Sequence, residues 1–155
     1  MKREEKIAHK KKITGIDEAM IDHLVRAFYE KIRVDPILGP IFNERISNWE
    51  PHLLKMVDFW SSATLKSGRY KGNPMIIHNS MPIDSRFFDR WLTLFAKTAT
   101  EVCPPEPAKT FVEKANLIAN SLELGIAVNN GSLPLVGERY IDQSLDYPEI
   151  DYSGE

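Results

Sequence analysis

The chain has 155 residues, which fits one domain with a hydrophobic core of its own. Lysine and arginine number 20 against 22 aspartates and glutamates, and the net charge of −2 gives no support to a nucleic-acid partner. The single cysteine, Cys103, excludes an intrachain disulfide and favours a reducing compartment. The N-terminus lacks an apolar signal region and no run reaches the length of a membrane span, so we expect a cytoplasmic protein without a membrane partner.

The chain begins with a basic segment, residues 1–15, which we expect to be a solvated tail. Next comes "GIDEAMIDHLVRAFYEKIRVDP", in which Asp17 and Glu18 stand at the start of a run of apolar residues at helical spacing. This pattern predicts a helix that closes at Asp35-Pro36. The following segment, residues 37–46, contains Gly39-Pro40 and several apolar residues, and it predicts an ordered connector packed on the core.

Two further helices and a short irregular segment fill the centre of the chain. "SNWEPHLLKMVDFWSSATLKSG" predicts a helix that is capped by Ser47 or Asn48 and ended by Gly68. "RYKGNPMIIHNSMP" has room for at most two helical turns. "DSRFFDRWLTLFAKTATEV" predicts a helix capped by Asp84 or Ser85, with a wide aromatic stripe.

The last periodic stretch, "EPAKTFVEKANLIANSLELGIAV", predicts another amphipathic helix. Residues 129–155 are acidic and without period, and they predict a flexible or surface-hugging tail. Residues 16–128 are thereby predicted to form one all-α domain of about four main helices.

Several kinds of site are excluded because their motifs are missing. The sequence contains no Cys-x-x-Cys pair, no His-Glu-x-x-His, no Glu-x-x-His, no phosphate-binding glycine loop and no Gly-x-Ser-x-Gly. We therefore assign no catalytic residue. A cofactor-free helical bundle that acts as an interaction module is one interpretation of such a chain.

Polar groups on the apolar faces favour a different interpretation. His52 shares a helix face with Met56, Tyr29 lies beside the stripe of its helix, and Trp91 stands among aromatic residues. His78 lies in the irregular segment, after three apolar residues. Such histidines are either core residues with satisfied hydrogen bonds or part of a pocket for a flat apolar cofactor such as haem.

Four segments carry a resemblance to a known family: "AFYEKIRVDPILGPIFNERI" (27–46), "WEPHLLKMVDFW" (49–60), "GRYKGNPMIIH" (68–78) and "FFDRWLTLF" (87–95). In the order and spacing of their aromatic, Tyr, His and Trp residues they resemble the group III truncated haemoglobins, over roughly residues 16–128. The missing Gly-Gly hinges of the other truncated groups agree with group III.

The resemblance implies a truncated globin fold, a two-over-two helical sandwich around haem b. His78 matches the proximal iron ligand, and Tyr29 matches the distal tyrosine. Phe42 matches the phenylalanine that packs on the haem. His52 matches the distal-helix histidine, which either donates to the ligand or swings out, and Met56 lines the same side.

Further residues around the haem follow from the same match. Trp91 matches the distal tryptophan, Phe88 the neighbouring wall and Trp60 a tryptophan of the distal helix. Ile77 can pack against the cofactor. Tyr70 and Arg69 can reach a haem propionate, although a solvated surface role for Arg69 is equally compatible. Asn79 departs from the apolar residue that would shield the proximal side.

The function implied is reversible binding of dioxygen, with carbon monoxide and nitric oxide as further ligands. Tyr29, Trp91 and His52 are the expected donors to the bound ligand, because a phenol O–H and an indole N–H can stabilise developing negative charge. A haem-dependent redox enzyme, a nitric oxide dioxygenase or a peroxidase-like protein, is the alternative, and it would need a reductase partner.

Overall fold

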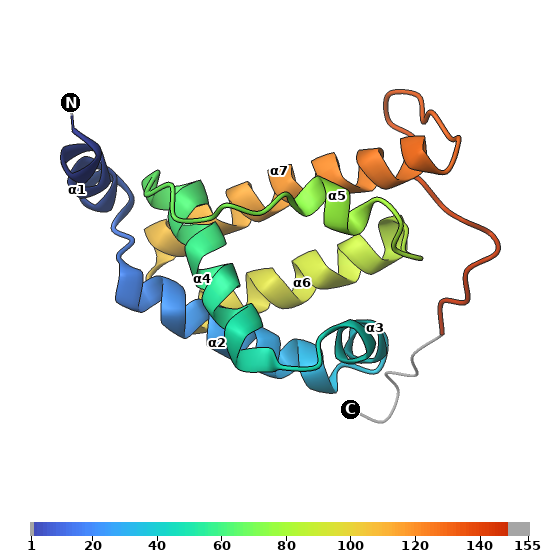
Figure 1. Ribbon diagram of the computed structural model, residues 1–155, viewed down its shortest axis with the longest axis horizontal. Helices are drawn as coiled ribbons and strands as arrows, with labels where there is room; N and C mark the ends of the chain where they lie inside the picture. Colours follow the sequence, from blue (N-terminus) through green and yellow to red (C-terminus); the bar gives the residue numbers. More distant parts are fainter. Residues whose placement is uncertain (1, 149–155) are drawn as a thin grey trace.

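Seven α-helices make up the computed structural model, which describes residues 2–148 and contains no β-strand in that range (Figure 1). α2 packs against α4 and α6, and α6 packs along α7, so two helix pairs form a two-over-two sandwich. The predicted all-α fold is thus confirmed. None of the described helices is long and apolar enough to span a membrane. The helices are α1 (Arg3–Thr14), α2 (Glu18–Val34), α3 (Leu38–Arg45), α4 (Trp49–Leu65), α5 (Pro74–His78), α6 (Ser85–Val102) and α7 (Pro105–Asn129).

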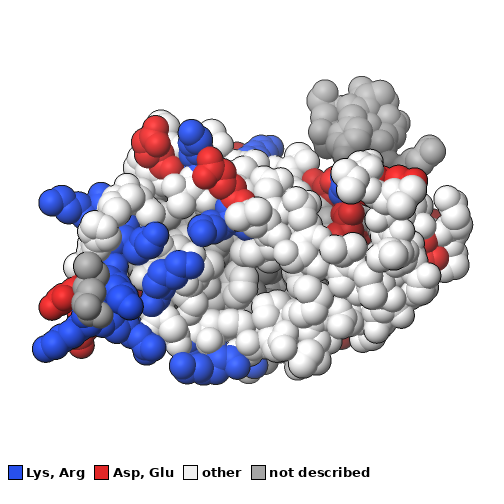
Figure 2. Space-filling view, turned by 90° about the horizontal axis from the view of Figure 1, so that it is seen from above, with Lys and Arg blue, Asp and Glu red and all other residues white. Residues whose placement is uncertain are grey.

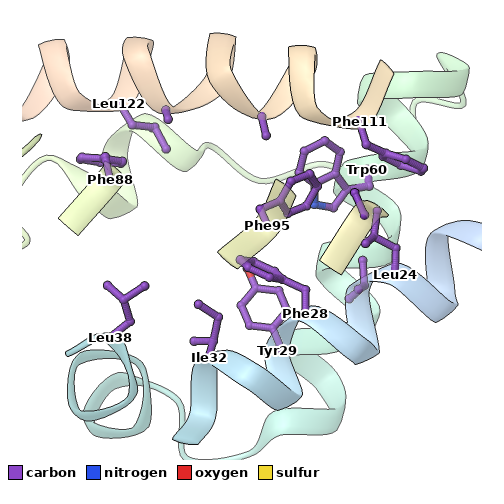
Figure 3. Packing of buried hydrophobic residues seen from close by; sticks show 14 of the residues in the cluster. Leu24, Phe28, Tyr29, Ile32, Leu38, Trp60, Phe88, Phe95, Phe111 and Leu122 are labelled. Carbon is purple, nitrogen blue, oxygen red and sulfur yellow. The ribbon is translucent and has the colours of Figure 1, made fainter. Parts of the chain in front are cut away.

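A column of aromatic rings joins α2, α4 and α6 (Figure 3). Phe95 of α6 stacks on Trp60 at 5.0 Å between ring centroids and on Trp91 at 5.4 Å. Phe28 of α2 meets Phe95 edge-on at 5.1 Å. Offset and edge-on ring pairs add to the free energy gained from burying the rings, so this column holds α2, α4 and α6 in register.

Residues 37–46 are ordered and packed on the core, as predicted, but most of the segment forms helix α3, which the prediction did not include. One oxygen of the Asp35 side chain accepts the N–H groups of Ile37 at 3.2 Å and Leu38 at 2.9 Å. This carboxylate satisfies donors that a helix start leaves without partners. The Gly39-Pro40 pair then lies within the first turn, where proline is tolerated, and does not break the chain.

The end of α4 also differs from the prediction. The helix stops at Leu65, and Lys66 takes the left-handed conformation with φ of 60°. Gly68 has φ of 72° but lies beyond the helix, where a Cβ would come within 3.3 Å of the Arg3 guanidinium. Gly68 therefore turns the following loop around α1, while a lysine makes the helix cap at some steric cost.

The basic N-terminal segment is a helix and not an irregular tail. α1 buries none of its residues, and its last turn contains Lys11 and Lys12. Figure 2 shows Lys and Arg side chains gathered at the end of the molecule where α1 lies. The helix contacts α4 and α7, so its backbone is ordered while its charges stay in solvent.

After α7 the chain hugs the surface, one of the two alternatives predicted for this tail. Tyr140 is buried, its carbonyl oxygen accepts the Ser85 N–H at 2.9 Å, and its hydroxyl accepts from the Asn130 amide at 2.9 Å. The Asp142 N–H donates to Asp84 at 3.1 Å. These bonds tie residues 130–142 to the start of α6. The last part of the predicted tail, residues 149–155, lies outside the described residues.

An ion pair joins the end of α2 to α6. Arg90 donates to the two oxygens of Asp35 at 2.7 and 2.6 Å, and both side chains are largely buried. Burial by itself would raise the pKa of Asp35. Arg90 and the two N–H groups at the start of α3 outweigh burial and hold that pKa below its usual value.

Asp35→Ala is expected to lower the free energy of unfolding by about 3 kcal/mol, because it leaves a largely buried guanidinium and two helix-start donors without this carboxylate. Urea denaturation of the purified protein measures the change. Asp22→Ala is the matched control, since Asp22 pairs with Arg26 on an exposed helix face and should cost less than about 1 kcal/mol. Equal losses in the two variants would contradict the assigned role.

Candidate functional site

His78 ends the five-residue helix α5, which begins at Pro74. Asn73 caps this helix by accepting the Ile76 N–H at 3.3 Å. The Nδ1 atom of His78 lies 2.7 Å from the carbonyl oxygen of Pro74. A carbonyl can only accept, so Nδ1 carries the proton and Nε2 keeps its lone pair. The ring is half-buried and oriented with Nε2 as its available ligand atom.

His52 lies in the second turn of α4 and is also half-buried. Its Nε2 is buried and has no hydrogen-bond partner within residues 2–148. Tyr29 and Trp49 meet its ring edge-on, at centroid distances of 5.5 and 5.7 Å. Because buried ring nitrogens are normally paired, an orphaned nitrogen between aromatic walls indicates a place for a ligand.

Tyr29 is the centre of this aromatic group. Only 5% of it is exposed, and its ring lies 5.9 Å from Phe42 and 5.9 Å from Trp49. Burial raises the pKa of the Tyr29 phenol, so the hydroxyl stays protonated and able to donate at neutral pH. The structure thus brings together three residues that the sequence had singled out, namely Tyr29, Phe42 and His52.

Trp49 is part of the same group, although it is not among the site residues predicted from the sequence. Its indole contacts both Tyr29 and His52, and the Arg33 guanidinium lies 4.9 Å over its ring. A signal was present, since Trp49 stands three residues before His52 and therefore shares its helix face. The ring contacts themselves depend on how α2 and α4 cross.

Both imidazoles are kept neutral by their surroundings. Burial lowers the pKa of His52, and the nearby Lys55 and His78 lower it further. Burial also lowers the pKa of His78, partly offset by the bond to Pro74. A neutral imidazole is the form that binds a metal.

Trp91 lies in the aromatic column, where its ring contacts Phe28 at 5.4 Å as well as Phe95. Phe88 is buried, and Met56 is half-buried against the core. All three side chains belong to the hydrophobic core or pack against it. Trp60, 3% exposed, belongs to the column.

Other predicted residues lie on the outside. Ile77 is 61% exposed, so its side chain is not packed in the core. Arg69 binds Glu18 at 2.6 Å and Asp58 at 3.1 Å, which is the surface setting that the sequence left open for it. The Tyr70 ring meets Phe59 edge-on at 5.2 Å.

Two hollows lie beside α4. One, of about 530 Å³, is lined by Tyr29, Leu53 and polar residues of α2 and α3. The other, of about 310 Å³, lies between α4, α5 and α7 and is lined mainly by apolar residues, among them Met75 and Leu122. Tyr29 contacts His52 and also borders the first hollow, so this aromatic group lies close to the surface of the protein.

The donor set fits haem. His78 offers a neutral imidazole with a free Nε2, His52 holds an orphaned buried nitrogen, and the rings of Tyr29 and Trp49 contact His52. Among the described residues, no group of three or more His, Cys, Asp or Glu side chains could hold a metal ion by itself. A porphyrin would supply the remaining ligands that iron needs.

Comparison with known proteins agrees with this assignment. No protein-family model matches the chain. The group 3 truncated hemoglobin ctb of Campylobacter jejuni subsp. jejuni serotype O:2 is 34% identical over 117 residues, covering 72% of this chain and 92% of that protein. The crystal structure of the group III truncated hemoglobin from Campylobacter jejuni superposes with a TM-score of 0.67 at 34% identity, over 70% of this chain and 89% of that chain.

The fold and these two matches therefore define a globin, a class of protein that binds haem. More narrowly, the chain belongs to the group III truncated haemoglobin family.

Acidification is expected to destabilise the haem-free protein, in part through His52. Its folded-state pKa lies below the ordinary value of about 6.5, so the unfolded chain binds more protons between the two values. The free energy of unfolding should therefore be highest above about pH 6.5 and fall as pH drops through the folded-state pKa. Urea denaturation at several pH values measures this dependence.

His52→Gln should make the pH dependence shallower. The exposed His23→Gln is the matched control and should keep the wild-type slope. A His52→Gln protein with an unchanged slope would show that His52 is not held neutral by the fold.

Proposed function

We propose that this protein binds haem b through the Nε2 atom of His78 and carries dioxygen reversibly, with carbon monoxide and nitric oxide as further ligands. The observation that carries the proposal is the 2.7 Å hydrogen bond from His78 Nδ1 to the Pro74 carbonyl. This bond fixes the tautomer in which Nε2 is the free ligand atom. Metal-binding histidines generally donate their other N–H to such an acceptor.

When bound, haem would supply an iron centre able to take a diatomic ligand. His78 would hold the cofactor. The Pro74 carbonyl accepts the hydrogen bond from Nδ1–H, which raises the electron density at Nε2 and makes the imidazole a stronger ligand. Phe42, Met56 and Phe88 provide apolar walls that exclude water from the cofactor faces.

On the distal side the chain offers donors of hydrogen bonds. The Tyr29 phenol is protonated, and His52 and Trp91 each have a ring nitrogen that can donate. A hydrogen bond to a ligand that carries partial negative charge contributes roughly 1.5–3 kcal/mol. That corresponds to about tenfold to a hundredfold in affinity for each donor that reaches the ligand. Dissociation of dioxygen should accordingly be slow.

His78→Ala should abolish stoichiometric haemin binding, because it removes the only ligand atom that the proposal gives to iron. Titration with haemin, followed by the Soret band, measures this in the mutant and wild-type proteins. Imidazole added to His78→Ala should restore the Soret band at least in part, because it can take the place of the missing side chain. Five-coordinate ferrous haem in His78→Ala without imidazole would contradict the assignment, and a wild-type protein that binds no haemin would indicate a cofactor-free helical module.

Tyr29→Phe should raise the dioxygen dissociation rate by about tenfold or more, because the ligand loses a charge-assisted hydrogen bond. Stopped-flow displacement of dioxygen by carbon monoxide measures the rate. Tyr140→Phe is the matched control, since Tyr140 loses the same hydroxyl but packs beside α6 and the end of α7. An unchanged rate in Tyr29→Phe would rule out the donor role, and fast turnover with nitric oxide or peroxide would contradict a carrier function.

A further inference from the structure

The helix that carries His78 is too short to hold its own position. α5 has five residues, and its internal bonds include Ile77 N–H to Asn73 at 3.4 Å and Asn79 N–H to Met75 at 3.0 Å. A helix of this length is unstable by itself, because nucleation costs more than so few bonds return. Its orientation must come from the element it packs on, which is α7 (Figure 1).

α5 packs most closely on α7 at Gly125, which has no side chain. A Cβ built at Gly125 would lie 2.2 Å from the Met75 sulfur and 3.1 Å from the Asn79 Oδ1 atom. Gly125 lies inside α7, where glycine destabilises a helix by about 1 kcal/mol relative to alanine. The residue is therefore explained by the close approach of α5 and not by the conformation of its own backbone.

A second contact lies one turn further along α7. The Asn129 side-chain amide donates to the Asn79 carbonyl oxygen at 2.9 Å. Met75 and Asn79 are four residues apart and so lie on one face of α5, the face turned to α7. His78 precedes Asn79 by one residue, which places it about 100° around the helix axis. Any roll of α5 on α7 would thus swing the imidazole by the same angle.

We infer that Gly125 and Asn129 are positioning residues for His78, which set the roll of α5 and thereby the direction of the His78 Nε2 atom. The inference rests on the proposed function, in which that atom binds haem iron. Gly125 admits the Met75 side chain into α7, and Asn129 fastens the following turn. The strength of the iron–histidine bond is then governed by two residues of α7 that need not touch haem.

Gly125→Ala tests the packing contact. The new methyl group should displace Met75 and tilt α5, at a cost typical of one added methylene in a packed interface, so haemin loss should accelerate by about tenfold. The iron–histidine stretching band of the ferrous protein, measured by resonance Raman spectroscopy, should shift. Because Met75 is flexible, α7 itself should stay folded, as circular dichroism will show. The double variant Met75→Ala/Gly125→Ala removes the clash and should return the band toward its wild-type position.

Asn129→Ala tests the hydrogen bond without adding bulk at an exposed position. Haemin loss should accelerate by about threefold to tenfold, the range for one lost hydrogen bond. In the haem-free protein, hydrogen exchange at the Asn79 N–H should also be faster. Asn116→Ala is the matched control, because Asn116 is an exposed asparagine of α7 whose amide bonds its own helix at Val112. It should leave both readouts unchanged.

Two outcomes would overturn the inference. One is a wild-type iron–histidine band in both Gly125→Ala and Asn129→Ala; the other is a shifted band that Met75→Ala does not restore. Failure of the proposed function is recognised separately, since His78→Ala would then keep the iron–histidine band whatever occupies position 125.

Discussion

The carboxylate of Asp35 makes the contacts on which the distal side depends. It starts α3 by accepting two backbone N–H groups, and it binds Arg90 of α6 through both oxygens. Three residues of the site are placed by these contacts: Tyr29 lies two turns earlier on α2, Phe42 lies on α3, and Trp91 directly follows Arg90. One buried charge thus sets how α2, α3 and α6 meet.

The site itself keeps polar atoms in an apolar setting. Buried polar groups without partners cost roughly 1–3 kcal/mol each, and His52 Nε2 and Asn79 Oδ1 are two such atoms among the described residues. Burial and ring packing in the aromatic column of the core offset that cost. In the proposed function, the orphaned His52 nitrogen is a preorganised donor or acceptor, which needs no rearrangement when a ligand binds.

How much the sequence could predict follows from how local each determinant is. The helices α2, α4, α6 and α7 bury one face each, so their apolar spacing was sufficient to predict them. The start of α3 was missed because Asp35, which accepts its first N–H groups, is held in place by Arg90, 55 residues away. Trp49 was on the right face, but no spacing rule says which ring of α2 it meets.

His78 shows the same division. The proline four residues before it was visible in the sequence, and a carbonyl at that distance lies within reach of a helical side chain. Its dependence on Gly125 was not visible, because residues 47 positions apart meet only after α5 has packed on α7. Asn79, whose polarity looked out of place beside a proximal ligand, joins α5 to α7 through its carbonyl.

The strap formed by residues 130–142 has a consequence for the order of folding. The Ser85 N–H at the start of α6 donates to the Tyr140 carbonyl oxygen. The Asp84 carboxylate accepts the Arg86 N–H with one oxygen and the Asp142 N–H with the other. Asp142 leaves the ribosome 58 positions after Asp84, the residue that precedes α6. During synthesis the start of α6 therefore lacks these partners until residues 140–142 have emerged and folded back, so the strap closes over this helix late in folding.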